Sequence, residues 1–420
     1  MAGQPHALII GGSVGGLLAA GMFRTIGWKA TVFERAVGDL AGRGAGLGMN
    51  EELLQVMRRI GARFDPSIGV AHRGYGWADR DGRMVFEHPR PTVGSAWSRV
   101  YQPLRDNVPG EIYRAGMTLE RVEQDADSVT AVFADGSRAT GDVLVAADGV
   151  YSTVRRQFLP EVQARYAGYV AWRGMVEERD LPRETLEMLA GRLIFGFPEG
   201  EMSLTMAVPG AGEDMRRGHR RVYFIWYRPA ADDAMADLFT DASGKNHGIA
   251  IPPPLIRPEL VADIKATAQA IFAPAMAAVV TRTAQPLLQA ITDMESPRLT
   301  FGRVAMIGDA AFIARPHVAA GVTKAALDAQ CLADSLAASG GDIPAGLAAY
   351  DRTQHRFDTA IVEHSRHLGA YLEARTKPPA ERGADATRDP YRIIREYGAP
   401  HLLHDIDVTG FLPDEETAPV

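Results

Sequence analysis

A glycine-rich turn near the start of the chain constrains the fold more than any other feature. It follows the apolar run Ala7-Leu-Ile-Ile10, which is typical of a buried strand. The turn itself is Gly11-Gly-Ser-Val-Gly-Gly16, and helical spacing continues from Val14 to Ile26. A second apolar run, Ala30-Thr-Val-Phe33, is predicted as another strand. The order strand, turn, helix and strand predicts a βαβ unit and therefore a parallel sheet.

The turn satisfies two motifs that indicate different chemistry. Gly11-x-Ser13-x-Gly15 matches the nucleophile elbow of a serine hydrolase, whereas Gly11-x-Ser13-x-x-Gly16 matches a dinucleotide fingerprint whose middle glycine is serine. An elbow needs several strands and an oxyanion loop before it, and only ten residues precede Gly11. The fingerprint needs an acidic residue about 20 positions later, and Glu34 follows Gly16 by 18 residues. The position favours the fingerprint, and a hydrolase using Ser13 is the remote alternative.

Each residue of the fingerprint has a physical task in a dinucleotide site. Gly11 makes the tight turn, Gly16 lets the helix pack closely on the strand, and the helix N-terminus offers free amides to a pyrophosphate. Ser13 is small enough to keep the backbone near the phosphates, and Glu34 would hold a ribose hydroxyl. The alternative is a tight turn between strand and helix that binds nothing.

Composition narrows the class of protein. The chain of 420 residues has 45 Lys and Arg against 52 Asp and Glu, so it lacks the basic surplus that a nucleic-acid partner would need. Its single cysteine, Cys331, excludes a disulfide framework and a multi-thiolate metal site, and it fits a reducing compartment. The uncharged run from 7 to 23 is interrupted by glycines and no Lys or Arg precedes it, so it is not a signal peptide. We predict a cytoplasmic protein without a membrane span or a metal site.

Two later segments repeat the pattern of a strand that ends in an acidic residue. The strand Val143-Leu-Val-Ala146 is followed by Asp148 and Gly149, and the strand Val304-Ala-Met-Ile307 is followed by Gly308 and Asp309. A helix is predicted soon after each of them, from about 153 and from about 319. Helix capping is an alternative role for either aspartate.

The region between these two segments differs in composition and strand pattern, which predicts a second domain. It holds aromatic-rich strands at 166–176, 193–197, 202–208 and 222–228, and a Pro-rich linker at 251–254. We expect a first domain at 1–165, an inserted domain at 166–300, a return to the first domain with C-terminal helices at 301–375, and a surface tail at 376–420 without a core of its own.

The three motifs, in this order and spacing, resemble those of the FAD-dependent aromatic hydroxylases, the single-component flavin monooxygenases built like p-hydroxybenzoate hydroxylase. The resemblance covers about residues 5 to 370. It implies an α/β fold with a Rossmann-like FAD-binding domain of the glutathione-reductase type and an inserted mixed-sheet substrate domain. It also implies bound FAD, transient NADH or NADPH, O2 and a small aromatic substrate. The oligomeric state is left open, with a homodimer as one option.

The resemblance assigns roles residue by residue. Glu34 would bind the adenosine ribose, Asp309 the ribityl chain, and the helix after Gly321 would direct its positive end at the flavin. Arg99 matches an arginine that reaches FAD from an early helix, and the segment 43–50 matches a loop under the isoalloxazine ring. The residues expected to bind FAD are Gly11, Ser13, Gly15, Gly16, Glu34, Arg35, Gly46, Arg99, Asp148, Gly149, Gly308, Asp309 and Gly321.

One branch of the family matches best. Most members carry Gln-Gly and a following Asn beside the flavin, where this chain has Ala320-Gly321 and Thr323. Together with the segment 166–174, this variant looks like the 2,6-dihydroxypyridine 3-hydroxylase branch, whose substrates are hydroxylated pyridines. The implied reaction is NAD(P)H-dependent hydroxylation of an electron-rich ring through a flavin C4a-hydroperoxide. The same reaction on a phenolic or polyketide ring and a non-catalytic flavin sensor are alternatives.

Four residues are candidates for the substrate site. His317 is the candidate catalytic residue, because it precedes the flavin-facing helix and an ordinary histidine titrates near neutral pH. Tyr169 and Arg173 share one face of a predicted strand and Trp172 lies on the other, so only one of these faces can line the pocket. The alternatives are a histidine packed in the pocket wall and a core tryptophan.

Overall fold

The N-terminal βαβ unit forms the centre of a largely parallel sheet, which we call the first sheet. The computed structural model describes residues 3–38, 40, 46–65, 68–384 and 388–406. β1 pairs in parallel with β2 and β12, and β19 pairs in parallel with β12 on its far side. The sheet has the order β18 (Thr300–Phe301), β19 (Val304–Met306), β12 (Val143–Ala146), β1 (His6–Ile10), β2 (Lys29–Glu34) and β8 (Tyr113–Ala115).

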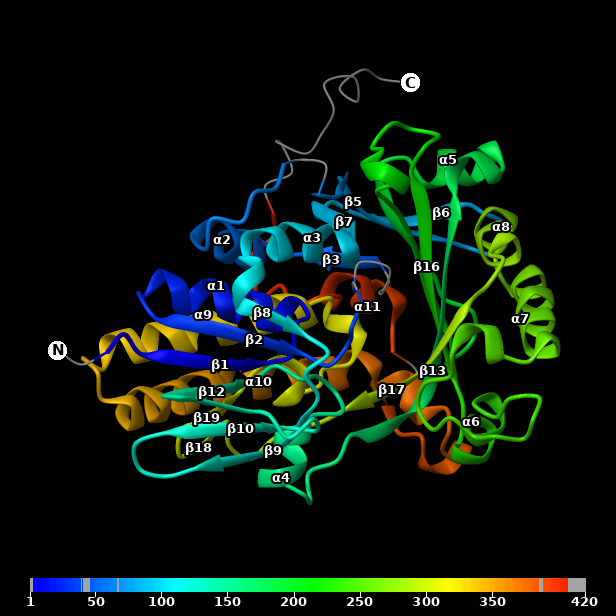
Figure 1. Cartoon of the computed structure of the whole chain (residues 1–420). Helices are drawn as coiled ribbons and strands as arrows, with labels where there is room; N and C mark the ends of the chain where they lie inside the picture. Colours follow the sequence, from blue (N-terminus) through cyan, green and yellow to red (C-terminus); the bar gives the residue numbers. More distant parts are fainter. Residues whose placement is uncertain (1–2, 39, 41–45, 66–67, 385–387, 407–420) are drawn as a thin grey trace.

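The helices around the first sheet bury small and apolar residues. α1 (Val14–Thr25) follows β1 directly and packs against α9 (Gly321–Ala338), which in turn contacts α2 (Glu51–Arg59) and the long α10 (Ile343–Ala374) (Figure 1). Leu17 and Leu18 of α1 are fully buried in this core. α3 (Trp97–Asn107) lies against α1, and α4 (Thr153–Phe158) contacts the strand β9 (Leu119–Gln124). An antiparallel meander of β9 (Leu119–Gln124), β10 (Val129–Phe133) and β11 (Arg138–Gly141) continues the same core.

A second, mixed sheet stands beside the first, and we call it the second sheet (Figure 1). Its long central pair, β13 and β16, is antiparallel over nine residue pairs within the described chain. The sheet has the order β17 (Leu287–Asp293), β13 (Arg165–Glu177), β16 (Arg221–Pro229), β15 (Met202–Val208), β14 (Arg192–Gly196), β5 (Gly74–Ala78) and β6 (Met84–His88).

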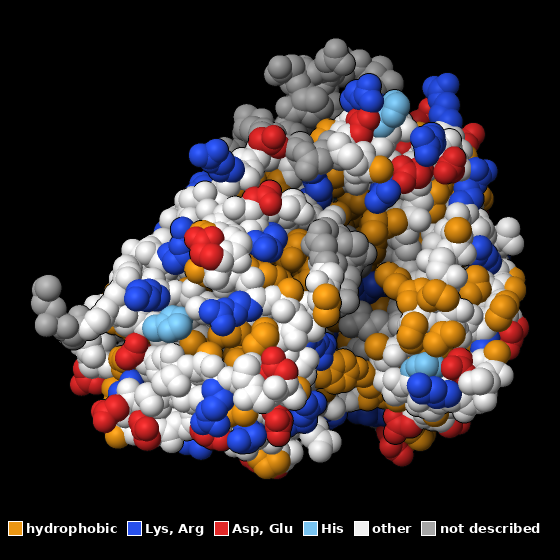
Figure 2. Space-filling model, in the orientation of Figure 1, with side chains coloured by type: hydrophobic (Ala, Val, Ile, Leu, Met, Phe, Trp, Pro, Cys, Tyr) orange, Lys and Arg blue, Asp and Glu red, His pale blue; other side chains and the backbone are white. Residues whose placement is uncertain are grey.

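The two faces of the second sheet have different neighbours. One face packs under α7 (Pro258–Ile271) and α8 (Pro274–Arg282), with α5 (Arg183–Leu189) and α6 (Asp232–Leu238) at its margins. The other face is aromatic and meets residues of α10 and of α11 (Pro390–Glu396). A small sheet of β3 (Gly46–Met49), β7 (Thr92–Ala96) and β4 (Val70–His72) contacts β15 through β7. Hydrophobic side chains gather along the junction between the half of the molecule built on the first sheet and the half built on the second sheet (Figure 2).

Two segments lie where the sequence boundaries did not place them. β5 and β6, at residues 74–88, pair into the second sheet, although they precede the range 166–300 by more than 70 residues. The segment after 376 does more than cover the surface, because Ile393, Ile394 and Tyr397 are buried against the second sheet. The division into domains remains a prediction. Among the described residues, no helix combines the length and apolar character that a membrane crossing requires.

The close approach of α1 to β1 gives the first testable prediction. A Cβ on Gly16 would lie 1.8 Å from the carbonyl oxygen of Gly11, whereas a Cβ on Gly15 would make an ordinary 3.5 Å contact with Ala325. We expect Gly16→Ala to lower the free energy of unfolding by at least about 1–3 kcal/mol, because backbone must shift to relieve the overlap. Gly15→Ala should leave it unchanged or raise it by up to about 1 kcal/mol, since alanine favours a helix. Urea unfolding of FAD-free protein measures both, and equal effects would contradict the packing argument.

Candidate active site

Two adjoining cavities follow the edge where the parallel strands end. The first has a volume of about 450 Å³ and the second about 410 Å³, and both are lined by Val150 and Tyr151. The first opens beside the glycine turn, β2 and the segment after β12. The second lies between the start of α9 and the aromatic face of the second sheet. Together they form one elongated site that runs from the first sheet to the second.

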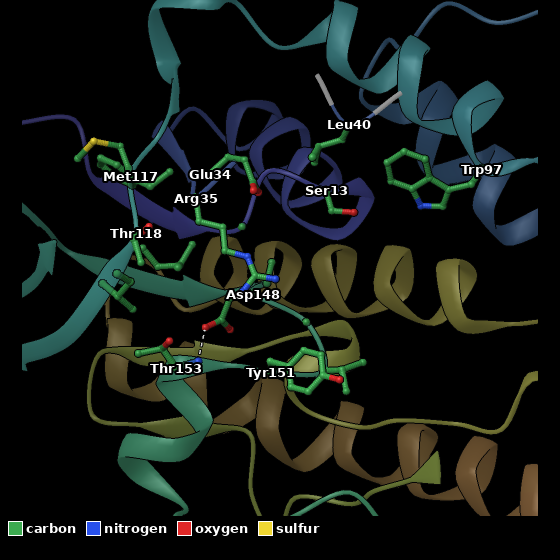
Figure 3. Close-up of a pocket in the computed structure, with 17 residues that line it drawn as sticks. Ser13, Glu34, Arg35, Leu40, Trp97, Met117, Thr118, Asp148, Tyr151 and Thr153 are labelled. Carbon is green, nitrogen blue, oxygen red and sulfur yellow. Dashed lines mark hydrogen bonds between the residues drawn. The ribbon is translucent and has the colours of Figure 1, made fainter. Parts of the chain in front are cut away.

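The glycine turn and Glu34 build one end of the first cavity (Figure 3). Glu34 ends β2 and accepts hydrogen bonds from the backbone N–H groups of Gly12, at 2.7 Å, and Ala36, at 2.8 Å. Gly11 has a φ of +107°, and a Cβ there would lie 2.3 Å from the carbonyl oxygen of Ala147. The sequence therefore needs glycine at this position, both for the backbone angle and for the approach of the neighbouring strand.

The N-terminus of α1 is left open toward this cavity. Ser13 occupies the N-cap position, but its side chain makes no capping hydrogen bond, and the first turn contains no acidic residue. The first amide groups of the helix therefore keep their capacity to bind an anion. Arg35 and Asp148 line the same space from the segments that follow β2 and β12, the two neighbours of β1 (Figure 3).

Asp148 combines a capping role with a free carboxylate oxygen. Its Oδ2 accepts the N–H of Thr153 at 2.7 Å, at the start of α4, and Ser152 accepts the N–H of Arg155 at 2.9 Å. The other carboxylate oxygen of Asp148, Oδ1, is buried and has no hydrogen-bond partner among the described residues. Burial raises the pKa of Asp148, while the hydrogen bonds lower it. The capping alternative is therefore correct for one oxygen and leaves the other available to a ligand.

Asp309 is presented to the second cavity by a buried charge cluster. Gly308, with a φ of +59°, makes the turn after β19, and Asp309 lines the cavity without a side-chain hydrogen bond to any described residue. Asp328 accepts a hydrogen bond from the N–H of Gly308 at 2.7 Å. Lys324 donates one to the carbonyl oxygen of Gly308 at 3.2 Å. Lys324 is neutralised by Asp328 at 2.9 Å and Asp358 at 3.3 Å. This cluster was not predicted from the sequence, although Lys324 and Asp328 have the i,i+4 spacing of a helical ion pair.

The start of α9 resembles that of α1. The N-cap residue Ala320 has no side-chain hydrogen bond to the helix, its first turn contains no acidic residue, and Gly321 lines the second cavity. Thr323 donates to Asn50 Oδ1 at 3.0 Å, which ties α9 to the end of β3. Gly46 also lines the cavity, where a Cβ would lie 2.7 Å from the Tyr223 ring. The rest of the predicted loop, residues 43–45, lies outside the described residues.

The structure brings together most of the predicted cofactor residues. The first cavity is lined by Gly11, Ser13, Glu34, Arg35, Asp148 and Gly149, and the second by Gly46, Asp309 and Gly321. Gly15, Gly16 and Gly308 shape the turns behind these walls. Arg99 does not line either cavity, but it lies on α3 two residues after Trp97, which lines the first.

The structure corrects the candidate role of His317. The side chain is 1% exposed, bonds Tyr169 Oη through Nε2 at 2.8 Å and packs against Tyr227 at a ring distance of 4.3 Å. Neither His317 nor Tyr169 lines the second cavity. Burial, reinforced by the charge of Arg315, lowers the pKa of His317 to about 3, so it is neutral at physiological pH. The alternative of a histidine packed in the pocket wall is the correct one.

Alternation on β13 separates the other three candidates as predicted. Arg173 lines the second cavity, whereas Trp172 is buried on the opposite face against the core of α7 and α8. Trp172 is therefore a core residue and not a substrate platform. Arg173 lies opposite Ile225 of β16 and hydrogen-bonds Tyr223, which also lines the cavity. Its Nε has no hydrogen-bond partner among the described residues.

Further tyrosines of the second cavity, Tyr227 and Tyr397 among them, were not predicted as site residues. Tyr227 lines the cavity with a buried hydroxyl that has no hydrogen-bond partner in the described chain. It shares a face of β16 with Tyr223, so strand alternation could have found it. Tyr397, in the segment predicted as a surface tail, also lines the cavity. No local pattern in the sequence indicates that contact.

Ser13 lacks the partner that a hydrolase requires. No histidine is among the described residues that line its cavity, and its neighbours there are Glu34, Arg35 and Asp148. A serine nucleophile needs an adjacent general base to remove its proton. The geometry therefore gives no support to the alternative of a serine hydrolase.

Comparison with known proteins agrees with this geometry. A family model described as "FAD binding domain-like" matches residues 166–293. The 2,6-dihydroxypyridine 3-monooxygenase of Paenarthrobacter nicotinovorans is 27% identical over 367 residues, which cover 87% of this chain and 91% of that protein. The 6-hydroxynicotinate 3-monooxygenase of Bordetella bronchiseptica is 25% identical over 418 residues, which cover 93% of this chain and 98% of that protein.

Solved structures extend the similarity to the whole architecture. The structure of 2,6-dihydroxypyridine-3-hydroxylase from Arthrobacter nicotinovorans has a TM-score of 0.82 and 26% identity, and the match covers 89% of this chain and 94% of that chain. The chain belongs to the FAD-dependent aromatic hydroxylases. The structure of Klebsiella pneumoniae HpxO complexed with FAD and uric acid has a TM-score of 0.72 and 26% identity with the present chain. The match covers 94% of the present chain and 96% of HpxO. The predicted family and fold class are thereby confirmed.

The hydroxylase binds FAD and uses NAD(P)H and O2. Its described residues fit this cofactor on three counts. The two uncapped helix starts, of α1 and α9, face the two cavities, where an anionic pyrophosphate and an electron-rich flavin edge would be stabilised. The turn at Gly11 has no room for a side chain. Asp148 has a buried carboxylate oxygen without a protein partner.

The low pKa of His317 predicts a pH dependence of stability. An unfolded histidine binds a proton below its ordinary pKa of 6.5, whereas the folded one stays neutral down to about pH 3, so stability falls as the pH falls through this window. Between pH 7 and pH 5 the loss attributable to His317 is about 2 kcal/mol. His317→Gln should remove this part of the dependence. Tyr169→Phe, which deletes the same hydrogen bond but keeps the imidazole, should retain it. Urea unfolding at both pH values decides, and parallel curves for wild type and His317→Gln would contradict the assignment.

Proposed function

We propose that the enzyme hydroxylates a small, electron-rich, hydroxylated N-heteroaromatic ring, with a hydroxypyridine as the leading candidate. The observation that carries the proposal is the second cavity, which adjoins the first. It joins an apolar wall to Arg173, a cation with no ion-pair partner among the described residues. The names of the relatives support the same substrate class, since they act on a dihydroxypyridine and a hydroxynicotinate.

The residues of the first cavity and the two helix starts would hold FAD. Glu34 would bind the adenosine ribose, the open end of α1 the pyrophosphate, and Asp309 the ribityl chain. Bound FAD would supply the redox chemistry, in which NAD(P)H provides two electrons and O2 provides one oxygen atom to the ring and one to water. The protein has to position the ring, exclude water and stabilise charge on the substrate.

Arg173 is the residue that we assign to the charge of the substrate. A second arginine on the cavity wall, Arg315, is neutralised by Asp293 at 2.7 Å and Glu373 at 2.8 Å. No described carboxylate lies within ion-pair distance of Arg173, which contacts the neutral Tyr223 instead. A cation in a partly buried cavity favours the ionised form of a ring hydroxyl, and ionisation makes the ring more nucleophilic. Tyr227 would direct its unpartnered hydroxyl at a second polar atom of the ring.

The cavity lining accounts for water exclusion. The strands of the second sheet contribute Leu193, Leu204, Met206, Ile225 and Ile291 to its wall. An apolar wall leaves few polar groups that could hold water beside the reacting atoms, and it strengthens the interaction between Arg173 and an anionic ring. The same wall would also accept a phenolic ring, so the substrate test has to include one.

A substrate panel tests the proposed function. We expect purified, FAD-loaded enzyme to oxidise NAD(P)H faster with hydroxypyridines than with phenols of equal size, and the product to gain one oxygen atom by mass. NADH and NADPH should be supplied separately, because the structure assigns neither preference. Stimulation by phenols alone would replace the proposed substrate class with the benzenoid alternative. Bound FAD without substrate-stimulated O2 uptake would favour a sensor.

Substitution of Arg173 tests its assignment. Loss of a hydrogen bond to a charged group costs about 1.5–3 kcal/mol, so Arg173→Met should raise the KM for a hydroxypyridine by about 10- to 100-fold. Arg173→Lys should lie between Arg173→Met and wild type, because it keeps the charge without the planar donor pair. Arg228→Met is the control, since Arg228 lies on the opposite face of β16 and pairs with Glu201. Steady-state kinetics of all variants at equal FAD content measure these KM values. An unchanged KM in Arg173→Met would reject the assignment of Arg173 to the substrate.

We further propose that the enzyme works in the cytoplasm, where NAD(P)H is supplied and the single Cys331 stays reduced. A homodimer remains a prediction, and sedimentation analysis of the FAD-loaded enzyme tests it.

A further inference from the structure

The segment after α10 returns to the cavity that the second sheet shares with α9. α11 lies between the two halves of the molecule (Figure 1), and its Ile393 and Ile394 are buried against the aromatic face of the second sheet. Tyr397 follows directly and lines the second cavity. A part of the chain distant in sequence from every other cavity residue therefore completes its wall.

Tyr397 belongs to the aromatic cluster that forms part of the cavity wall. Its ring is 7% exposed and meets Tyr75 at 6.1 Å and Phe195 at 5.1 Å, both in edge-to-face geometry. Tyr223 and Arg173 line the same cavity as Tyr397. Burial raises the pKa of Tyr397, so the phenol stays protonated and can donate a hydrogen bond.

Arg90 holds the backbone of Tyr397 in place. It lies between β6 and β7, is 7% exposed, and donates through Nη1 to the carbonyl oxygen of Tyr397 at 2.5 Å. Its Nε bonds Asp405 at 2.9 Å, and its guanidinium lies 5.6 Å from the ring centre of Tyr75. Arg90 thus contacts the segment at Tyr397 and at Asp405, and it also contacts Tyr75, an aromatic neighbour of the Tyr397 ring.

The turn after Tyr397 is fixed by other elements. Gly398, with a φ of +77°, donates its N–H to the carbonyl oxygen of His317 at 3.0 Å, and its own carbonyl oxygen lies 2.7 Å from His364 Nε2. Further on, Glu52 of α2 accepts the N–H of His404 at 2.8 Å. The segment is therefore attached to the loop before α9, to α10 and to α2, and a hydrogen-bonded backbone gives the Tyr397 ring one defined position.

We propose that the segment 390–406 places Tyr397 in the wall of the substrate cavity, and that Tyr397 contacts the substrate ring and determines which rings fit. Arg90 is a positioning residue that acts through Tyr397. The inference rests on the proposed function, because it takes the second cavity as the place where the ring binds.

Substitutions at three positions test the wall. In FAD-loaded enzyme, Tyr397→Ala should raise the KM for the best hydroxypyridine at least 10-fold and admit bulkier two-ring substrates that wild type rejects. It should also lower the product formed per NAD(P)H, since the ring is held less firmly. Tyr397→Phe keeps the shape and should raise the KM only about 3- to 10-fold. Arg90→Gln should shift selectivity in the same direction as Tyr397→Ala, and adding it to Tyr397→Ala should have little further effect.

Tyr391→Ala is the matched control. Tyr391 belongs to the same segment and packs on Trp77 and Phe86, but it does not line the second cavity. It should leave the KM, the selectivity and the coupling unchanged. Tyr397→Phe provides a mild variant if Tyr397→Ala folds poorly, and FAD content and melting temperature report the fold of each.

The outcomes separate the two proposals. A wild-type enzyme stimulated by hydroxypyridines, together with an unchanged KM and selectivity in Tyr397→Ala, would overturn the wall and leave the function standing. Equal changes in Tyr391→Ala and Tyr397→Ala would also overturn it, because they would reflect the stability of the segment alone. A wild-type enzyme that no ring of the panel stimulates would overturn the proposed function, and the inference with it.

Discussion

The whole site depends on how closely α1 packs against β1. Gly16 leaves no room for a side chain beside Gly11, and this contact brings the uncapped helix end to the edge where the parallel strands stop. Since β2, β12 and β19 run parallel to β1, the residues that follow them reach the same edge. Glu34, Asp148 and Asp309 are therefore neighbours for one topological reason, although they are far apart in the sequence.

The second sheet adds what a dinucleotide fold alone does not provide. It places an apolar wall, several tyrosines and Arg173 opposite the start of α9. Glu34, Asp148 and Asp309 line the proposed cofactor end together with Arg35, whereas Arg173 lies among tyrosines and apolar side chains of the second cavity. With the proposed function, this separation would let one elongated site bind a large cofactor along its length and still favour an anionic ring at its far end.

Local patterns were sufficient for the parallel strands, the glycine turn and the two faces of β13, because each depends on residues close together in sequence. They failed where burial is decided by distant segments. Whether His317 faces the cavity depends on Tyr169 and Tyr227, which belong to the second sheet and are distant from His317 in sequence. Alternation separated Trp172 from Arg173, but only the packing of α7 and α8 shows which face is core. The pairing of β5 with β14 joins residues more than 100 positions apart, which no local window detects.

The interleaving of the two halves has a consequence for the order of events during synthesis. The second sheet needs β5 and β6, which precede it by many residues, and the cavity wall needs Tyr397, which follows α10. A growing chain can therefore assemble β1, α1, β2 and the glycine turn early, but it cannot enclose a substrate until the ribosome has passed the long helix. The glycine turn is therefore synthesised long before Tyr397, the last of the described residues that line the second cavity.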